Sequence, residues 1–157
     1  MTDKQVFRPA PIDDQAFTIA FDAFQKLDRG ARTGEWDDFI ACLHEDLTWF
    51  VPVPGFQGLH RGKESVAELF KHHAAVTRTH WNLKNVVANG NEIGFECWTE
   101  GTIEGKSYGN QLLMLFVIEN GLIRHFREYG GYNNGIGEFV GHGDPKDGAE
   151  AYAYKGR

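Results

Sequence analysis

The chain has 157 residues, of which 41% are apolar and 13% aromatic, and its formal net charge is −6 at pH 7. This length and composition indicate one folded domain with a substantial core rather than a disordered chain. The acidic balance argues against nucleic acid as a partner, because phosphate recognition needs a basic surface. No window of about 18 apolar residues predicts a membrane span. The two cysteines, Cys42 and Cys97, form neither a CxxC motif nor a disulfide framework, so we expect a cytoplasmic protein without nucleic-acid or membrane partners.

The first predicted helix follows an N-terminal arm, residues 1–12. Asp13 or Asp14 can cap this helix, which extends to about Ala31. Its apolar stripe, at helical spacing, consists of Phe17, Ala20, Phe21 and Phe24. Asp28 lies four residues after the last of these. The pattern therefore places a carboxylate on the face that the helix otherwise buries.

Two further helices, over about residues 35–44 and 63–77, are predicted before the main sheet, with a strand over 47–53 between them. Four successive antiparallel strands follow, separated by turns at Asn89-Gly90-Asn91, Glu104-Gly105-Lys106 and Glu119-Asn120-Gly121. This order predicts an α+β fold, in which three N-terminal helices pack on a strongly curved, mostly antiparallel sheet. The domain is predicted over residues 13–133, and a Gly-rich C-terminal tail over 134–157.

The last predicted hairpin carries polar residues among bulky apolar ones. Tyr108 and Asn110 belong to its first strand, and Glu128 belongs to its second. A carboxylate on such a strand either faces a pocket or pairs locally with Arg127 or Arg124. A desolvated glutamate has a raised pKa and can act as a general acid. Tyr108 and Asn110 would then orient a substrate oxygen, although both can equally be structural.

Five short motifs occur along the chain in a characteristic order. They are Gly34-Glu35-Trp36-Asp37-Asp38-Phe39, Gly62-Lys63-Glu64, His80-Trp81, Glu119-Asn120-Gly121-Leu122-Ile123 and Arg127-Glu128-Tyr129. Their order and spacing resemble the nuclear-transport-factor-2-like superfamily, and within it the SnoaL-like branch of polyketide cyclases, dehydratases and isomerases. The resemblance implies a cone-shaped α+β barrel and a homodimer joined through the open sheet face.

Two subgroups of this superfamily suggest site residues. The last hairpin is similar to that of the phenazine-biosynthesis A/B proteins, which use the equivalents of Tyr108 and Glu128 at the substrate pocket, the glutamate as acid/base. Scytalone dehydratase and hexachlorocyclohexane dehydrochlorinase pair an aspartate with a histidine, and Asp28 and His80 occupy comparable positions. A histidine held by a carboxylate is a base suited to elimination or isomerisation. The alternative is that Asp28 pairs with a neighbouring arginine and His80 is a structural residue.

We therefore expect a cofactor-free acid/base enzyme, a lyase such as a dehydratase, an isomerase or a cyclase, that acts on a small, largely apolar, ring-containing molecule in a cone-shaped pocket. His80 would be the base, Asp28 its partner and Glu128 the acid. The residues predicted to bind substrate are Tyr108, Asn110, Trp36, Phe24 and His73. No metal is expected, because the adjacent residues His72 and His73 would diverge by about 100° on a helix. The alternatives are a non-catalytic ligand-binding protein and a dimerising scaffold with a filled core.

Overall fold

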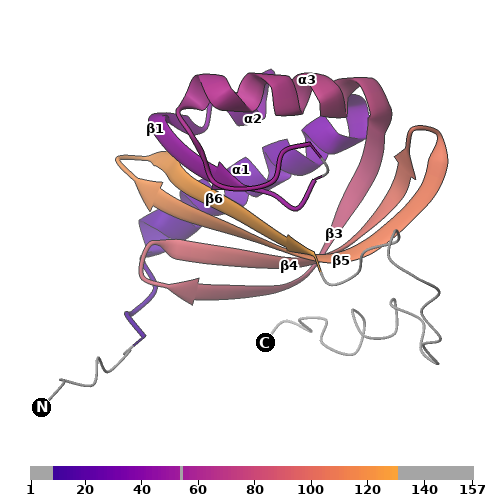
Figure 1. Cartoon of the computed structure of the whole chain (residues 1–157). Helices are drawn as coiled ribbons and strands as arrows, with labels where there is room; N and C mark the ends of the chain where they lie inside the picture. Colours follow the sequence, from indigo (N-terminus) through magenta and orange to yellow (C-terminus); the bar gives the residue numbers. More distant parts are fainter. Residues whose placement is uncertain (1–8, 54, 131–157) are drawn as a thin grey trace, which may run out of the picture.

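The computed structural model describes residues 9–53 and 55–130, which form helices packed on a six-stranded sheet (Figure 1). Residues 1–8 of the predicted arm and the whole predicted Gly-rich tail, 134–157, lie outside the described residues. The predicted domain limits therefore stay predictions.

Helix α1 spans Asp14–Thr33 and begins as the sequence predicts. The side chain of Asp13 caps its first turn, and Gly34, with φ of 84°, ends it. This left-handed conformation carries no steric penalty for glycine. Phe24 and Asp28 both lie on the buried face of the helix, which confirms that the apolar stripe includes a carboxylate.

The region after α1 differs from the prediction. Helix α2 is limited to Asp37–Ile40, and strand β1 already begins within the predicted helix, over Leu43–Phe50. Leu43 is buried and pairs in parallel with Ile123 of the last strand. The predicted helix over 35–44 is therefore wrong in its second half, because pairing with a distant strand overrides the local helical pattern.

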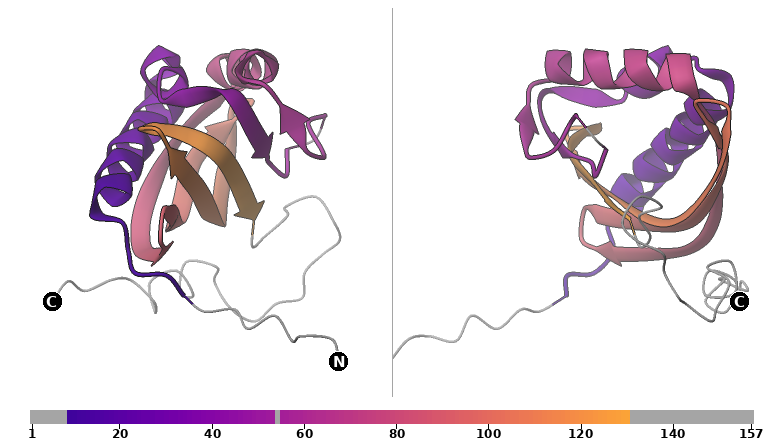
Figure 2. Two further views of the ribbon diagram at one scale, coloured as in Figure 1. Left: turned by 90° about the vertical axis from the view of Figure 1, so that its left-hand side faces the viewer. Right: turned by 45° about the vertical axis from the view of Figure 1, so that its right-hand side comes forward.

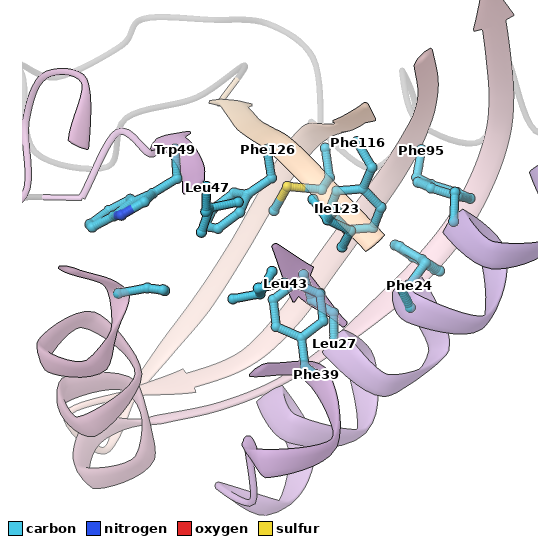
Figure 3. Close-up of a cluster of buried hydrophobic side chains, with 14 of the residues drawn as sticks. Phe24, Leu27, Phe39, Leu43, Leu47, Trp49, Phe95, Phe116, Ile123 and Phe126 are labelled. Carbon is cyan, nitrogen blue, oxygen red and sulfur yellow. The ribbon is translucent and has the colours of Figure 1, made fainter. Parts of the chain in front are cut away.

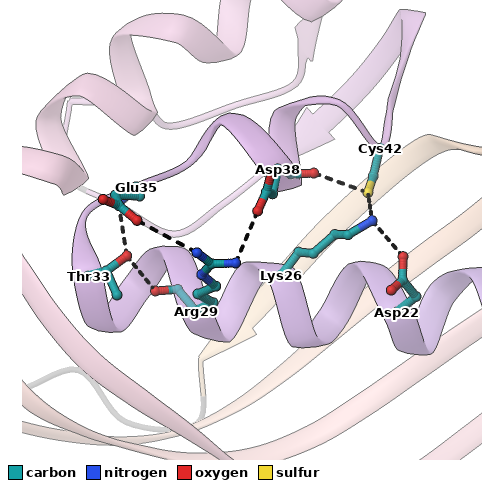
Figure 4. A network of polar contacts seen from close by, with 7 residues as sticks. All are labelled: Asp22, Lys26, Arg29, Thr33, Glu35, Asp38 and Cys42. Carbon is teal, nitrogen blue, oxygen red and sulfur yellow. Dashed lines mark hydrogen bonds and ion pairs between the residues drawn. The ribbon is translucent and has the colours of Figure 1, made fainter.

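Ion pairs along α1 hold the connection to α2 (Figure 4). Arg29 lies 3.3 Å from the Asp38 carboxylate and 3.9 Å from that of Glu35. One turn earlier, Lys26 lies 3.8 Å from the thiol of Cys42. Exposed pairs of this kind contribute little energy one by one, but together they orient the short segment between the two helices.

The segment after β1 contains a short strand that the sequence does not predict, β2 (His60–Arg61), which pairs with β1. A 3-10 turn, Lys63–Val66, then leads into α3, Ala67–Val76. The predicted third helix is thus present, but its first turn is a 3-10 helix rather than an α-helix.

Four long antiparallel strands complete the sheet: β3 (Thr77–Asn89), β4 (Glu92–Ile103), β5 (Lys106–Glu119) and β6 (Leu122–Gly130). The spatial order is β2-β1-β6-β5-β4-β3, and β1 runs parallel to β6. The sheet curves around α1, and the helices lie on its concave side (Figure 2). This confirms the predicted α+β cone.

The hydrophobic core fills the space between the concave face and the helices (Figure 3). Phe24 of α1 stacks on Phe95 of β4 with ring centroids 4.6 Å apart. Phe39 of α2 lies against Phe126 of β6, at 6.3 Å. Burying each such side chain contributes about 1.5–3 kcal/mol, so the aromatic residues fix the helices on the sheet.

Candidate active site

A cavity lies between the helices and the concave face of the sheet. The space open to the centres of water molecules is about 90 Å³, several times the roughly 10–15 Å³ that one water requires. Most of the wall is apolar, with Leu27, Ala31, Phe39, Phe70, Leu112, Met114 and Phe126 among its residues. The wall also contains a few polar side chains, namely Glu128, Tyr108, His73, Thr77, Thr79 and Thr99. An apolar pocket with few polar groups is typical of a small-molecule site.

Glu128 lies on β6 opposite Met114 of β5 and lines the cavity. Its carboxyl group makes no hydrogen bond or ion pair with another described residue, since Arg127 pairs with Glu92 and Arg124 with Glu119. The alternative of a local ion pair between Glu128 and Arg127 or Arg124 is therefore not formed in the described part of the chain. Burial raises the pKa of Glu128 from 4.5 to about 7, because the low-dielectric wall disfavours the charged form.

Tyr108 and Asn110 form a polar pair on β5. Asn110 donates from Nδ2 to the Tyr108 hydroxyl oxygen at 3.2 Å, and Tyr108 lines the cavity. Burial raises the pKa of Tyr108. The hydrogen bond from Asn110 lowers this pKa by a smaller amount, and the nearby Glu128 carboxylate raises it further. Because its oxygen accepts from Asn110, the Tyr108 hydroxyl keeps its own proton for donation to a ligand.

His73 and Trp36 also line the cavity. Burial lowers the pKa of His73 to about 4, with a smaller contribution from His72, so its imidazole is neutral near pH 7. Trp36 packs on Phe70 with ring centroids 4.7 Å apart. Both placements agree with the predicted substrate-binding residues, although binding itself stays a prediction.

Phe24, a predicted substrate-binding residue, lies in the hydrophobic core, and its role in binding stays a prediction. Its ring stacks on Phe95 within the core, and it is not among the residues that line the cavity. Its helical position favoured the buried face, but the cavity begins one turn further along, at Leu27 and Ala31.

Asp28 and His80 meet as the sequence predicts, but away from the cavity. The Asp28 carboxylate lies 2.9 Å from His80 Nδ1 and is 8% exposed as a residue. Neither residue lines the cavity. Successive side chains of a strand point to opposite sides, so Thr79 and Trp81 line the cavity while the His80 side chain is 51% exposed. The catalytic role of this pair stays a prediction.

Sequence reasoning did not single out the threonines of the cavity wall. Thr77 and Thr79 alternate with exposed residues along β3, and Thr99 follows the buried residues Phe95 and Cys97 on β4 with the same period of two. That alternation was the available signal, because residues two apart share one face of a strand.

Within residues 9–53 and 55–130, no group of three His, Cys, Asp or Glu side chains is arranged to hold a metal ion. None of the helices in this part of the chain is long and apolar enough to cross a membrane. The cytoplasmic location stays a prediction.

Comparison with known proteins agrees with this fold. The SnoaL-like domain family matches residues 21–126, and the chain belongs to this family. A nuclear-transport-factor-2-like protein from Anabaena variabilis ATCC 29413 is 31% identical, with a TM-score of 0.73 over 79% of this chain and 95% of that chain. No curated protein matches the sequence significantly.

Two more distant structures show the same fold. A protein from Jannaschia sp. CCS1, provisionally named a SnoaL-like polyketide cyclase, is 14% identical, with a TM-score of 0.61 over 80% of this chain and 92% of that one. An epoxide hydrolase from M. tuberculosis, described as LEH-like, is 20% identical, with a TM-score of 0.59 over 72% and 83%. At these identities the likeness concerns the fold alone.

Proposed function

We propose that this protein is a cofactor-free acid/base enzyme of the lyase, isomerase or cyclase type, acting on a small, largely apolar, ring-containing molecule. The observation that supports this is Glu128, a cavity-lining carboxyl group with a pKa raised to about 7 and no ion-pair partner among the described residues. A general acid or base is most effective when its pKa lies near the working pH.

Glu128 can transfer a proton in either direction. Near pH 7 both of its forms are populated, so it can take a proton from carbon or give one to a leaving oxygen. The Tyr108 hydroxyl can donate a hydrogen bond to an oxygen on which charge develops. Elimination, isomerisation and ring closure all need these two actions. The proposal gives the acid/base role to Glu128 rather than to His80, because the His80 side chain is off the cavity.

The experiment that tests the proposal is the base-promoted ring opening of 5-nitrobenzisoxazole, a flat and uncharged compound. A base removes the ring C–H proton next to nitrogen, that electron pair forms the nitrile, and the N–O bond breaks to release a coloured nitrophenolate. A carboxylate in an apolar cavity is a stronger base than one in water. We expect the wild-type protein to accelerate the reaction and Glu128→Gln to lose the acceleration.

Glu96→Gln is the matched control. Glu96 lies on β4, which β5 separates from the strand of Glu128. It accepts a 3.0 Å hydrogen bond from Gln111 and does not line the cavity. We expect this variant to keep the wild-type rate. Equal rates for wild type and Glu128→Gln would reject the proposal. A non-catalytic binding protein of the same fold would bind the probe, seen as quenching of tryptophan fluorescence, without any Glu128-dependent ring opening.

We also propose that the chain forms a homodimer through the outer face of the sheet. On β5 the buried residues alternate with Leu113, Leu115 and Val117, which are only half-buried. No described helix covers this outer face (Figure 2). A row of apolar side chains in the middle of an uncovered sheet is a typical protein-interaction surface.

A further inference from the structure

Two of the residues that line the cavity, Trp36 and Thr99, each carry a buried polar atom, Nε1 and Oγ1, that has no hydrogen-bond partner among the described residues. Both residues line the cavity, and they are 8% and 1% exposed. A buried polar group without a partner costs about 1–3 kcal/mol. Native proteins retain few of them, so these two atoms need a partner that the described chain does not supply.

The two atoms belong to different walls of the cavity. Trp36 lies in the connection between α1 and α2, on the helical side. Thr99 lies on β4, on the sheet side, where it is opposite Trp81 of β3 and Asn110 of β5. A ligand that satisfies both atoms therefore extends from the helices to the sheet and carries a polar group toward each.

The charge of the cavity restricts the ligand further. No Lys or Arg is among the described residues of the wall, and His73 is neutral near pH 7 because burial lowers its pKa to about 4. An anionic ligand would lie near the Glu128 carboxylate with no cation to balance either charge, which is unfavourable in an apolar site. A positively charged group beside Trp36 would offer no acceptor to its indole N–H, which can only donate.

We infer that the cavity binds an uncharged ring compound with two oxygen acceptors, one for Trp36 Nε1–H and one for the Thr99 hydroxyl. A carbonyl or hydroxyl oxygen fits either position. Trp36 and Thr99 then determine which ring compounds bind, while Glu128 acts on what is bound. The inference rests on the proposed function, because it names the substrate class of the same cavity.

The test measures the affinity of four bicyclic probes by isothermal titration calorimetry: tetralin, 1-tetralone, 4-hydroxy-1-tetralone and 1-naphthoate. Their ring systems are similar, and they carry no oxygen, one oxygen, two oxygens and a negative charge. We expect affinity to rise from tetralin to 1-tetralone to 4-hydroxy-1-tetralone, and 1-naphthoate to bind least.

Two variants each remove one recognition group, Trp36→Phe and Thr99→Val. One hydrogen bond contributes about 0.5–1.5 kcal/mol, so each should lower the affinity ratio of 4-hydroxy-1-tetralone to tetralin by roughly two- to tenfold. The ratio corrects for changes in cavity shape, which affect both ligands. Matched controls are Trp98→Phe and Thr102→Val, because neither residue lines the cavity.

The stability of Thr99→Val provides a second readout. The variant removes a buried hydroxyl that no described residue satisfies, so its melting temperature should stay equal to that of the wild type or rise. A hydroxyl with a purely structural role would give the opposite result, a fall in melting temperature with no change in the affinity ratio.

Three outcomes would overturn the inference: tightest binding of 1-naphthoate, unchanged affinity ratios in both variants, or no binding of any probe. The proposed function fails separately. Binding in the expected order without Glu128-dependent ring opening would support the inference and reject the enzyme. Glu128-dependent ring opening with unchanged ratios would support the enzyme and overturn the inference.

Discussion

The Asp28 carboxylate of α1 and the His80 ring of β3 are 2.9 Å apart, and the same carboxylate oxygen accepts the backbone N–H of Trp81 at 2.7 Å. Its other oxygen accepts from Arg32 Nε at 3.0 Å. β3 is an edge strand, so its outward N–H has no strand to pair with. Asp28 therefore joins α1 to the free edge of the sheet through two hydrogen bonds, while its contact with Arg32 stays within α1.

Asp28→Ala should destabilise the fold much more than His80→Ala. The aspartate is buried and its removal leaves the Trp81 N–H unsatisfied, which should lower the free energy of unfolding by about 2–3 kcal/mol. The half-exposed His80 loses one bond, and the cost should be about 1 kcal/mol or less. Urea denaturation measures both. We expect the His80→Ala variant to keep the wild-type ring-opening rate. A folded but inactive His80→Ala variant would indicate instead that His80, held by Asp28, is the base.

The pKa of Glu128 predicts how stability changes with pH. Because folding raises this pKa from 4.5 to about 7, the native state binds more protons than the unfolded state between these values. Stability is therefore greatest below the lower value and falls as pH rises toward the upper one. One pKa unit corresponds to about 1.4 kcal/mol, so the loss is at most about 3 kcal/mol.

Glu128→Gln isolates this effect, because glutamine does not titrate. The free energy of unfolding of wild type minus that of the variant should fall between about pH 5 and pH 7 and stay constant above about pH 8. Denaturation curves for both proteins across this range provide the measurement. A difference independent of pH would show that the Glu128 pKa is not raised.

Tyr108→Phe tests the role of the phenol in stabilising developing negative charge. Removing one such donor can lower a rate by about a hundredfold, and we expect a fall up to this size for the nitrobenzisoxazole probe. The pH dependence should still follow Glu128. Ser107→Ala, at an exposed neighbouring position on β5, is the control. A Tyr108→Phe rate equal to that of the wild type would exclude this role.

Gly30→Ala should destabilise the protein even though alanine is the better helix former. A Cβ atom at position 30 would lie 2.5 Å from Cε3 of Trp36, so the indole would have to move. Overpacking of this kind costs about 1–3 kcal/mol, more than the roughly 1 kcal/mol that helix propensity returns. Ligand affinity should fall as well, because Trp36 lines the cavity. Thr18→Ala, on the exposed side of α1, should leave ligand affinity unchanged and should not destabilise the protein, because alanine is the better helix former.

Local signals were sufficient for most of the fold. Asp13 and Gly34 mark the two ends of α1, and Asn-Gly turns near residues 90 and 121 separate the long strands. These features were predictable because caps and turns depend on adjacent residues. The prediction for the second helix failed in its second half because Leu43 pairs with Ile123, a contact between residues far apart in the sequence.

The candidate site was predictable only in part. Glu128 and Tyr108 stood out as polar groups on apolar strands, and both line the cavity. Alternation separates His80 from Thr79 but does not tell which of the two faces the helices. A β-bulge between Leu83 and Asn85 then changes the alternation along β3. Which side of a curved sheet is concave depends on tertiary packing, so the sequence did not show that the His80 side chain lies off the cavity.

The proposed dimer gives the last prediction. Leu115 lies at the centre of the outer face, packed over Gly94, where an added Cβ atom would lie 2.8 Å from it. A charge at this position would have to be buried without a partner in a homodimer. We expect the wild type to sediment as a dimer of the 17.7 kDa chain and Leu115→Lys to sediment as a folded monomer.

Leu59→Lys is the matched control, because Leu59 is an exposed apolar residue in the segment between β1 and β2, outside the β5 row. It should leave the dimer intact. Analytical ultracentrifugation at several concentrations separates the cases, since a dimer held by a sheet face dissociates on dilution with a defined constant. A monomeric wild type would reject the dimer.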